Sequence, residues 1–205
     1  MIDLYTDATS NGRRAAVMLE ETGAPYRATR VSLEKGDQKK PDFLKLNPLG
    51  QIPVIVDHDG PGGKTVTLSQ SGAIALYLAE KTGKLLPKDG AKRALAQQWF
   101  AHALSDVGPA SGTLFNLTMS IPEKPPASIA FFENRLVGFF RNVDKRLAEA
   151  EYLAGELSIA DLALYPTYAV RKDLLDKAGG FANLARWAAK LTARPGVQRG
   201  MKVPS

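Results

Sequence analysis

The chain has 205 residues, of which 27 are lysine or arginine and 21 are aspartate or glutamate, so its net charge is +6. It contains no cysteine, which excludes disulfides, thiolate metal sites and any redox thiol of its own. The two histidines, His58 and His102, lie far apart, so we expect no histidine-based metal site. No apolar run approaches the roughly 20 residues of a membrane helix, and the start lacks the plan of a secretory signal. We therefore expect a soluble cytoplasmic protein with no membrane partner.

The excess positive charge favours anionic partners, but the basic residues are scattered and interleaved with acids. No basic face carries a known nucleic-acid reading element, so we expect no nucleic-acid partner.

The first third of the chain predicts alternating strands and helices. Ile2 to Tyr5 alternates apolar and polar residues, as a short strand does. The following loop is rich in threonine, serine and asparagine, which favour turns and helix starts. A helix is expected from Arg13 to Thr22, with its end at Gly23. A second strand is expected over Pro25 to Leu33, followed by a short helix over Asp42 to Leu46.

The chain is organised around the stretch from Asn47 to Ser71, where two β-branched runs flank a glycine-rich turn and predict an antiparallel hairpin. Pro53 begins the first strand, so we expect the backbone of Gln51 and Ile52 to lie outside the ladder, and the bond before Pro53 is a candidate for the cis isomer. A helix follows from Ser71 to Lys81, and its first N–H groups have no internal partners. Such a combination can hold an extended peptide and its carboxylate.

Beyond residue 83 the pattern becomes helical. We expect Pro109 and Gly112 to interrupt the first helical segment. Its apolar stripe comprises Ala91, Leu95, Trp99 and Ala103. A second stripe comprises Ile129, Phe132, Leu136, Phe139, Phe140, Val143 and Leu147. Ser158 and Asp161 have the spacing of a capping box, and a last helix covers Phe181 to Leu191.

The bend Gln51-Ile52-Pro53, the helix start Gln70-Ser71 and the capping box from Ser158 to Asp161 occur in an order that resembles the cytosolic glutathione transferases, over essentially the whole chain. The resemblance implies an α/β thioredoxin-like domain over residues 1–83, a linker over 84–90, and an all-α domain over 91–205. It also implies a homodimer with glutathione, reduced or oxidised, as cosubstrate.

The loop Thr9-Ser10-Asn11-Gly12 and the segment Gly36-Asp37-Gln38 look like those of the bacterial nu-class proteins, which are glutathione-dependent disulfide-bond reductases. This resemblance implies that Thr9 and Asn11 contact the glutathione sulfur. It implies that Gln38 binds the glycine end of the tripeptide or a second glutathione.

The same resemblance implies that Gln51 and Ile52 bind the cysteinyl and glycyl parts, and that Gln70 and Ser71 hold the γ-glutamyl end. Position 70 is commonly an acid in the family, so Gln70 lacks a charge opposite the γ-glutamyl ammonium. Nu-class proteins often carry an arginine near the cleft; here Arg135 lies about one turn farther along its helix, which leaves its part in holding a second glutathione open.

Threonine, serine and asparagine before a helix are also ordinary helix caps. We expect Ser10 to serve as the cap of the loop's helix, and Thr9 and Asn11 to act on the ligand. At the next helix, Ser69 or Ser71 is the expected cap. Other transferase classes use a tyrosine near the end of the first strand, but Tyr5 lies inside the strand and is expected to belong to the core or the sheet surface.

The leading hypothesis is disulfide-bond reduction by thiol-disulfide exchange, with a small disulfide as second substrate. The alternative within the same site is conjugation of glutathione to electrophiles, for which Phe115, Met119, Phe131 and Phe132 can line an apolar pocket. An alternative of another class is a non-catalytic interaction module of the same fold, which would not need the whole set of polar residues named above.

Overall fold

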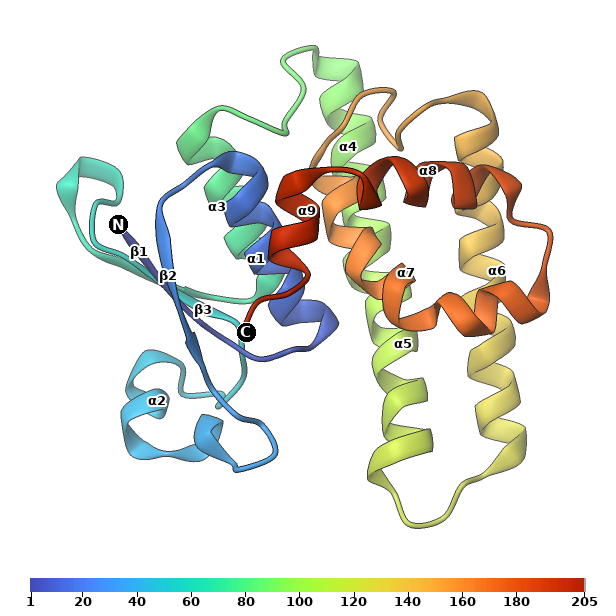
Figure 1. The fold of residues 1–205 in the computed structure, drawn as a ribbon, viewed down its shortest axis with the longest axis horizontal. Helices are drawn as coiled ribbons and strands as arrows, with labels where there is room; N and C mark the ends of the chain where they lie inside the picture. The colour runs from blue at the N-terminus through green and yellow to red at the C-terminus, as the bar shows by residue number, and fades with distance from the viewer. Residues whose placement is uncertain (205) are drawn as a thin grey trace. The chain divides into compact units, whose positions relative to one another are not determined.

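The computed structural model describes residues 1–204, and its contacts divide the chain into two units. The first unit combines Met1–Leu85 with the residues from Thr192 onward, and the second spans Leu86–Leu191. The first unit is an α/β layer structure built on a mixed sheet, and the second is made of helices (Figure 1). The predicted fold class is confirmed.

The first unit follows the predicted order of strand, helix, strand, short helix, strand, strand, helix. Its elements are β1 (Ile2–Thr6), α1 (Ser10–Thr22), β2 (Tyr26–Arg30), α2 (Pro41–Leu46), β3 (Val54–Asp57), β4 (Val66–Ser69), α3 (Ser71–Thr82) and α9 (Pro195–Gly200). The sheet has the strand order β2-β1-β3-β4; β1 is parallel to β2, and the pairs β1/β3 and β3/β4 are antiparallel. Helices α1 and α3 pack together beside the sheet (Figure 1).

Helix α1 buries Ala15, Met18, Leu19 and Thr22, as its helical spacing predicts. It ends at Gly23, whose φ of 73° is left-handed and favours glycine. The peptide bond between Ile52 and Pro53 is cis, in agreement with the expectation for this bend.

The last segment of the chain packs on α1. The buried carboxylate of Glu21 accepts hydrogen bonds from Arg194 Nη2 at 2.6 Å and from the Val197 amide at 3.1 Å. A Cβ atom on Gly200 would lie 2.6 Å from Val17 Cα, so the α9 backbone touches α1 directly. The sequence division assigned these last residues to the helical domain. The structure groups them with the first unit because of this ion pair and close contact.

The second unit contains α4 (Gly90–His102), α5 (Gly108–Phe115), α6 (Pro126–Glu149), α7 (Ile159–Ala178) and α8 (Ala182–Thr192). Two π-helical turns, Ala103–Val107 and Asn116–Ser120, extend the path of α4 and α5. The helical path therefore continues through the expected interruption at Pro109 and Gly112: a widened, π-helical turn precedes Pro109, and the helix does not break. The Gly108 amide bonds to the Ala103 carbonyl, and Pro109 sits at the start of α5, where its missing N–H is tolerated.

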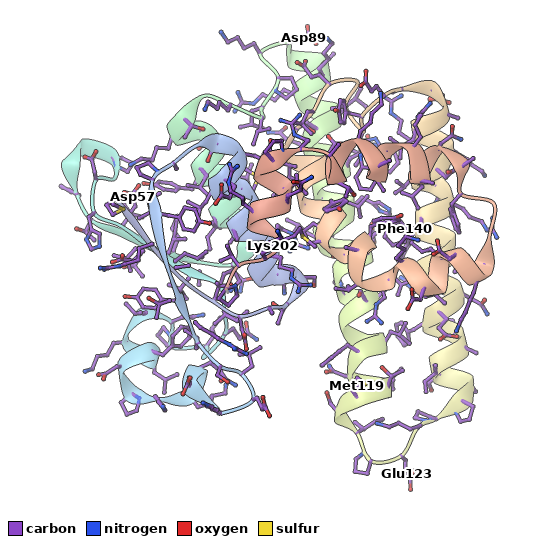
Figure 2. All side chains as sticks on the ribbon, viewed as in Figure 1. Asp57, Asp89, Met119, Glu123, Phe140 and Lys202 are labelled. Atoms are coloured by element: carbon purple, nitrogen blue, oxygen red, sulfur yellow. The ribbon has the colours of Figure 1, made fainter. Side chains whose placement is uncertain are left out.

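The core of the second unit agrees with one predicted stripe and only in part with the other. Leu136, Phe140, Val143 and Leu147 are fully buried on α6, and Figure 2 shows Phe140 among the helices, away from Met119 and Glu123, which lie where the chain turns from the α5 segment into α6. The first stripe is right only at its end: Ala103 is buried and Trp99 half-buried, but Ala91 and Leu95 are exposed, and α4 instead buries Ala96 and Phe100. The stripe is shifted by one position because α7 packs on that face of α4.

The predicted capping box is confirmed. The Ser158 amide and hydroxyl both donate to Asp161 Oδ2, at 3.0 and 3.1 Å, and Trp187 Nε1 donates to Oδ1 at 2.9 Å. Asp161 therefore fixes the start of α7 and joins it to α8. Over residues 1–204, no helix has the length and apolar character needed to cross a membrane.

Candidate functional site

The loop between β1 and α1 is anchored by Asp7. Its Oδ1 accepts from the Ala8 amide at 2.9 Å and from Arg30 Nε at 3.3 Å, while Oδ2 accepts from the Leu33 amide at 2.9 Å. Burial alone would raise the pKa of Asp7, but these amides and the Arg30 guanidinium hold it below its usual value. Sequence reasoning missed Asp7; its signal was an acid placed directly between a strand and a helix start.

Thr9 is the cap of α1. Its Oγ1 accepts from the Gly12 amide at 3.0 Å, and Ser10 is the first helical residue, so the expectation that Ser10 is the cap is wrong. Capping uses one lone pair of the Thr9 oxygen and leaves the hydroxyl hydrogen free to donate. A Cβ atom on Gly12 would lie 2.1 Å from the Asp7 carbonyl oxygen, so only glycine fits at this turn.

Asn11 and Ser71 are joined by Arg14. Nη1 of Arg14 donates to Asn11 Oδ1 at 2.8 Å and to Ser71 Oγ at 2.6 Å. Arg14 is 2% exposed, and burial lowers its pKa to about 10, so it remains a cation at neutral pH. The structure thus brings together two predicted site residues that are 60 positions apart in the sequence, through an arginine that the sequence analysis did not single out. The available signal was a charged residue on the apolar face of α1.

The start of α3 has no side-chain cap within residues 1–204. Gln70 occupies the capping position with a φ of 69°, which is a strained conformation for a residue with a side chain. The expectation that Ser69 or Ser71 caps this helix is wrong, because the hydroxyl of Ser71 turns to Arg14. The first N–H groups of α3 therefore suit an anionic group of a ligand.

Gln38 lies beside the bend that precedes β3. Among the described residues, its Oε1 is buried without a hydrogen-bond partner. A Cβ atom on Gly50, whose φ is 61°, would lie 3.0 Å from the Gln38 carbonyl oxygen, so the two backbones approach closely. A carboxamide that needs a donor and can itself donate fits a peptide amide of a ligand.

At the bend, Gln51 and Ile52 lie outside the sheet ladder, as expected, because β3 begins at Val54. The Gln51 carbonyl oxygen accepts from Asn47 Nδ2 at 2.7 Å, so this part of the Gln51 backbone is already satisfied. Gln51 is exposed, and Ile52 is half-buried against the cluster of Val31, Phe43 and Val54. Tyr5 is partly buried and packs against the same cluster, so of its two expected places, the core and the sheet surface, it lies at the edge of the core.

The residues expected on the helical domain lie in the second unit. Arg135 is exposed on α6, and its guanidinium carbon lies 5.3 Å from the centre of the Phe139 ring. Phe115, Met119 and Phe131 are 53%, 69% and 58% exposed, unusually high values for large apolar side chains.

Two models of known protein families match this chain. The model of the glutathione S-transferase N-terminal domain matches residues 9–81, and that of the C-terminal domain matches residues 114–199. The chain belongs to the glutathione transferase family. This transferase is 36% identical to the disulfide-bond oxidoreductase YfcG of Escherichia coli over 198 residues, 95% of this chain and 92% of YfcG. It is 33% identical to the disulfide-bond oxidoreductase YghU of the same organism, over 97% of this chain and 73% of YghU.

Solved glutathione transferases share the fold of this transferase. One is from Pseudomonas putida and has one glutathione disulfide bound per subunit. It is 33% identical, with a TM-score of 0.93, and the match covers 100% of this chain and 92% of the Pseudomonas putida chain. Another is from Burkholderia graminis and has two glutathione molecules bound per subunit. It is 35% identical, with a TM-score of 0.92, and the match covers 100% of this chain and 88% of the Burkholderia graminis chain.

Proposed function

We propose that this transferase reduces disulfide bonds at the expense of glutathione, by thiol-disulfide exchange. The observation that carries the proposal is the start of α1, where a hydroxyl and a carboxamide stand at the positive end of a helix in a chain without cysteine. All reacting sulfur atoms must then come from the substrates. The similarity to two disulfide-bond oxidoreductases supports this reaction.

In this proposal the site residues divide the tripeptide among them. Thr9 and Asn11 donate to the sulfur, with Ser10 in the same turn. Gln38, Gln51 and Ile52 bind the cysteinyl and glycyl parts. Gln70 and Ser71, with the free amides of α3, bind the γ-glutamyl carboxylate. Within the described residues 1–204, Gln38 Oε1 lacks a hydrogen-bond partner and the start of α3 lacks a side-chain cap, and both features fit such a ligand.

Thiolate formation sets the energetic requirement. A free thiol has a pKa of about 8.5, and lowering it by about two units takes roughly 2.7 kcal/mol. One hydrogen bond to a charged acceptor contributes about 1.5–3 kcal/mol, and a helix start adds a few tenths to about 1 kcal/mol. A Thr9 donor, supported by Asn11 and α1, is therefore sufficient without a catalytic histidine or cysteine.

The exchange balances without any further reactant. The thiolate of one glutathione attacks a sulfur of the substrate disulfide, forms a mixed disulfide and releases the other half as a thiolate. A second glutathione thiolate attacks the mixed disulfide, which yields glutathione disulfide and the second substrate thiolate. The protein's part is to hold the attacking thiol and to stabilise its thiolate, whose proton passes to solvent.

A second candidate is conjugation of glutathione to an electrophilic carbon. The exposed aromatic side chains of the second unit, Phe115 and Phe131, favour it because they suit apolar electrophiles. We further propose a homodimer that acts in the cytoplasm, where glutathione is kept reduced; light scattering of the purified protein would test the dimer.

The deciding experiment compares two assays on one preparation: reduction of bis(2-hydroxyethyl) disulfide by glutathione, and conjugation of 1-chloro-2,4-dinitrobenzene. Calorimetric titration with reduced and oxidised glutathione accompanies them. We expect efficient disulfide reduction, weak conjugation, and either tight binding of the oxidised form or two reduced molecules per chain. Conjugation without disulfide reduction would favour the second candidate. No binding of either form at millimolar concentration would favour a non-catalytic interaction module.

A further inference from the structure

Arg14 is a charged residue in an apolar place. It lies on the buried face of α1, in sequence with Ala15, Ala16 and Val17, which are all fully buried. Burying a cation is unfavourable unless it is held by hydrogen bonds. A leucine or methionine would pack there at less cost, so the arginine calls for an explanation beyond the folding of α1.

The hydrogen bonds of Arg14 indicate why an arginine occupies this position. The Nη1 nitrogen carries two hydrogens, and it donates to both Asn11 Oδ1 and Ser71 Oγ. With Oδ1 held by Arg14, the NH₂ group of the Asn11 carboxamide is the part that remains to donate elsewhere. With its oxygen accepting from Arg14, the Ser71 hydroxyl likewise keeps its hydrogen for another acceptor. One buried cation thus sets the donor direction of two groups.

We propose that Arg14 is a positioning residue that aims Asn11 and Ser71 at the two anionic ends of one glutathione, the thiolate and the γ-glutamyl carboxylate. The inference rests on the proposed function, because it assumes that glutathione occupies this site. Arg14 touches neither end itself; it acts through the two side chains. Its charge is buried and only weakly screened by solvent, so it also attracts both anions.

The guanidinium geometry is part of the proposal. Lysine retains the charge but presents a single compact ammonium on a flexible stem, so it cannot reproduce the fixed direction of both hydrogen bonds. Methionine fills a similar volume with neither charge nor donor. Arg14→Lys and Arg14→Met therefore separate the effect of charge from the effect of orientation. Arg27→Met removes one exposed positive charge from β2 of the same unit and serves as the control for net charge.

The test measures the pKa of the bound glutathione thiol, from the ultraviolet absorbance of its thiolate against pH, and the glutathione affinity by calorimetry. Circular dichroism and thermal melting report folding. For Arg14→Met we expect a thiol pKa higher by about one unit, which from a bound thiol pKa of about 6.5 lowers the thiolate fraction at pH 7 about threefold, together with at least tenfold weaker binding. Arg14→Lys should fold like the wild type. Its thiol pKa and its glutathione affinity should lie between those of Arg14→Met and those of the wild type. Arg27→Met, which loses an ion pair with Asp3, should match the wild type in thiol pKa and glutathione affinity.

A second measurement leaves Arg14 in place, in case its variants fail to fold. Asn11→Ala, Ser71→Ala and the double variant form a cycle for glutathione affinity. Coupling between the two positions of twofold or more supports the link through Arg14, and strictly additive effects overturn it. A folded Arg14→Met with wild-type thiol pKa and affinity also overturns it. A wild-type protein that binds no glutathione overturns the proposed function, and this proposal with it.

Discussion

Thr9 has two roles that can be separated by substitution. As the cap of α1 it accepts a hydrogen bond from the Gly12 amide, and as the proposed donor to the thiolate it uses its hydroxyl hydrogen. Thr9→Val keeps the shape and loses both roles. Thr9→Asp keeps an acceptor for the Gly12 amide but offers no donor. Thr9→Ser keeps both.

The two roles predict different magnitudes. Loss of a cap destabilises a protein by about 1 kcal/mol, which for a chain of this size lowers Tm by about 2–4 °C. Loss of a hydrogen bond to the thiolate, worth about 1.5–3 kcal/mol, raises the thiol pKa by about one to two units. From a wild-type bound thiol pKa of about 6.5, the rate at pH 7 should then fall roughly 3- to 25-fold, and it should recover as the pH approaches the raised pKa.

The assay is the rate of disulfide reduction between pH 6 and 9.5, with Tm measured on the same samples. Thr9→Val should lose both stability and rate at pH 7, Thr9→Asp should lose rate but little stability, and Thr9→Ser should resemble the wild type. If Thr9→Asp is as active as the wild type at pH 7, the hydroxyl donates to no thiolate and the reasoning fails. A rate loss that does not depend on pH would also contradict it.

Three further predictions follow from the same structure. Gly12→Ala places a methyl group against the Asp7 carbonyl, so the loop must shift, and we expect a loss of glutathione binding by calorimetry larger than any loss of helix content by circular dichroism. Asp161→Ala leaves four buried donors without an acceptor and should lower the free energy of unfolding in urea by about 3 kcal/mol or more, whereas an effect below 1 kcal/mol would contradict this account. Burial would raise the pKa of Asp57, but Lys81, Tyr77 and a backbone amide hold it below the usual 3.8. Because the unfolded state then binds the proton first, stability should fall as the pH drops below about 4, and less steeply in Asp57→Asn.

Much of the fold could be predicted from the sequence because the signals are local. Helix α1 buries the residues that its spacing indicates and ends at Gly23. The hairpin, the bend at Pro53 and the capping box of Asp161 each depend on residues close together in the chain. Local chemistry of turns, caps and periodicity determines these features wherever the rest of the chain folds.

Only the tertiary structure decided which face of each helix is buried and which element packs against it. The α4 stripe was misplaced by one residue, because a helix with apolar residues on two faces gives no local sign of which face α7 covers. The docking of α9 depends on Glu21 and Arg194, which lie at opposite ends of the chain.

The candidate site shows the same division. The resemblance of its motifs to those of the glutathione transferases pointed to Thr9, Asn11, Gln70 and Ser71. Which serine or threonine caps each helix was not predictable, because these side chains have similar propensities and the choice depends on their partners in space. Ser71 does not cap α3 because Arg14, 57 positions earlier, holds its hydroxyl. A buried arginine needs hydrogen-bond partners, and Arg14 meets Ser71 only because α1 packs against α3. Only the folded chain determines that packing.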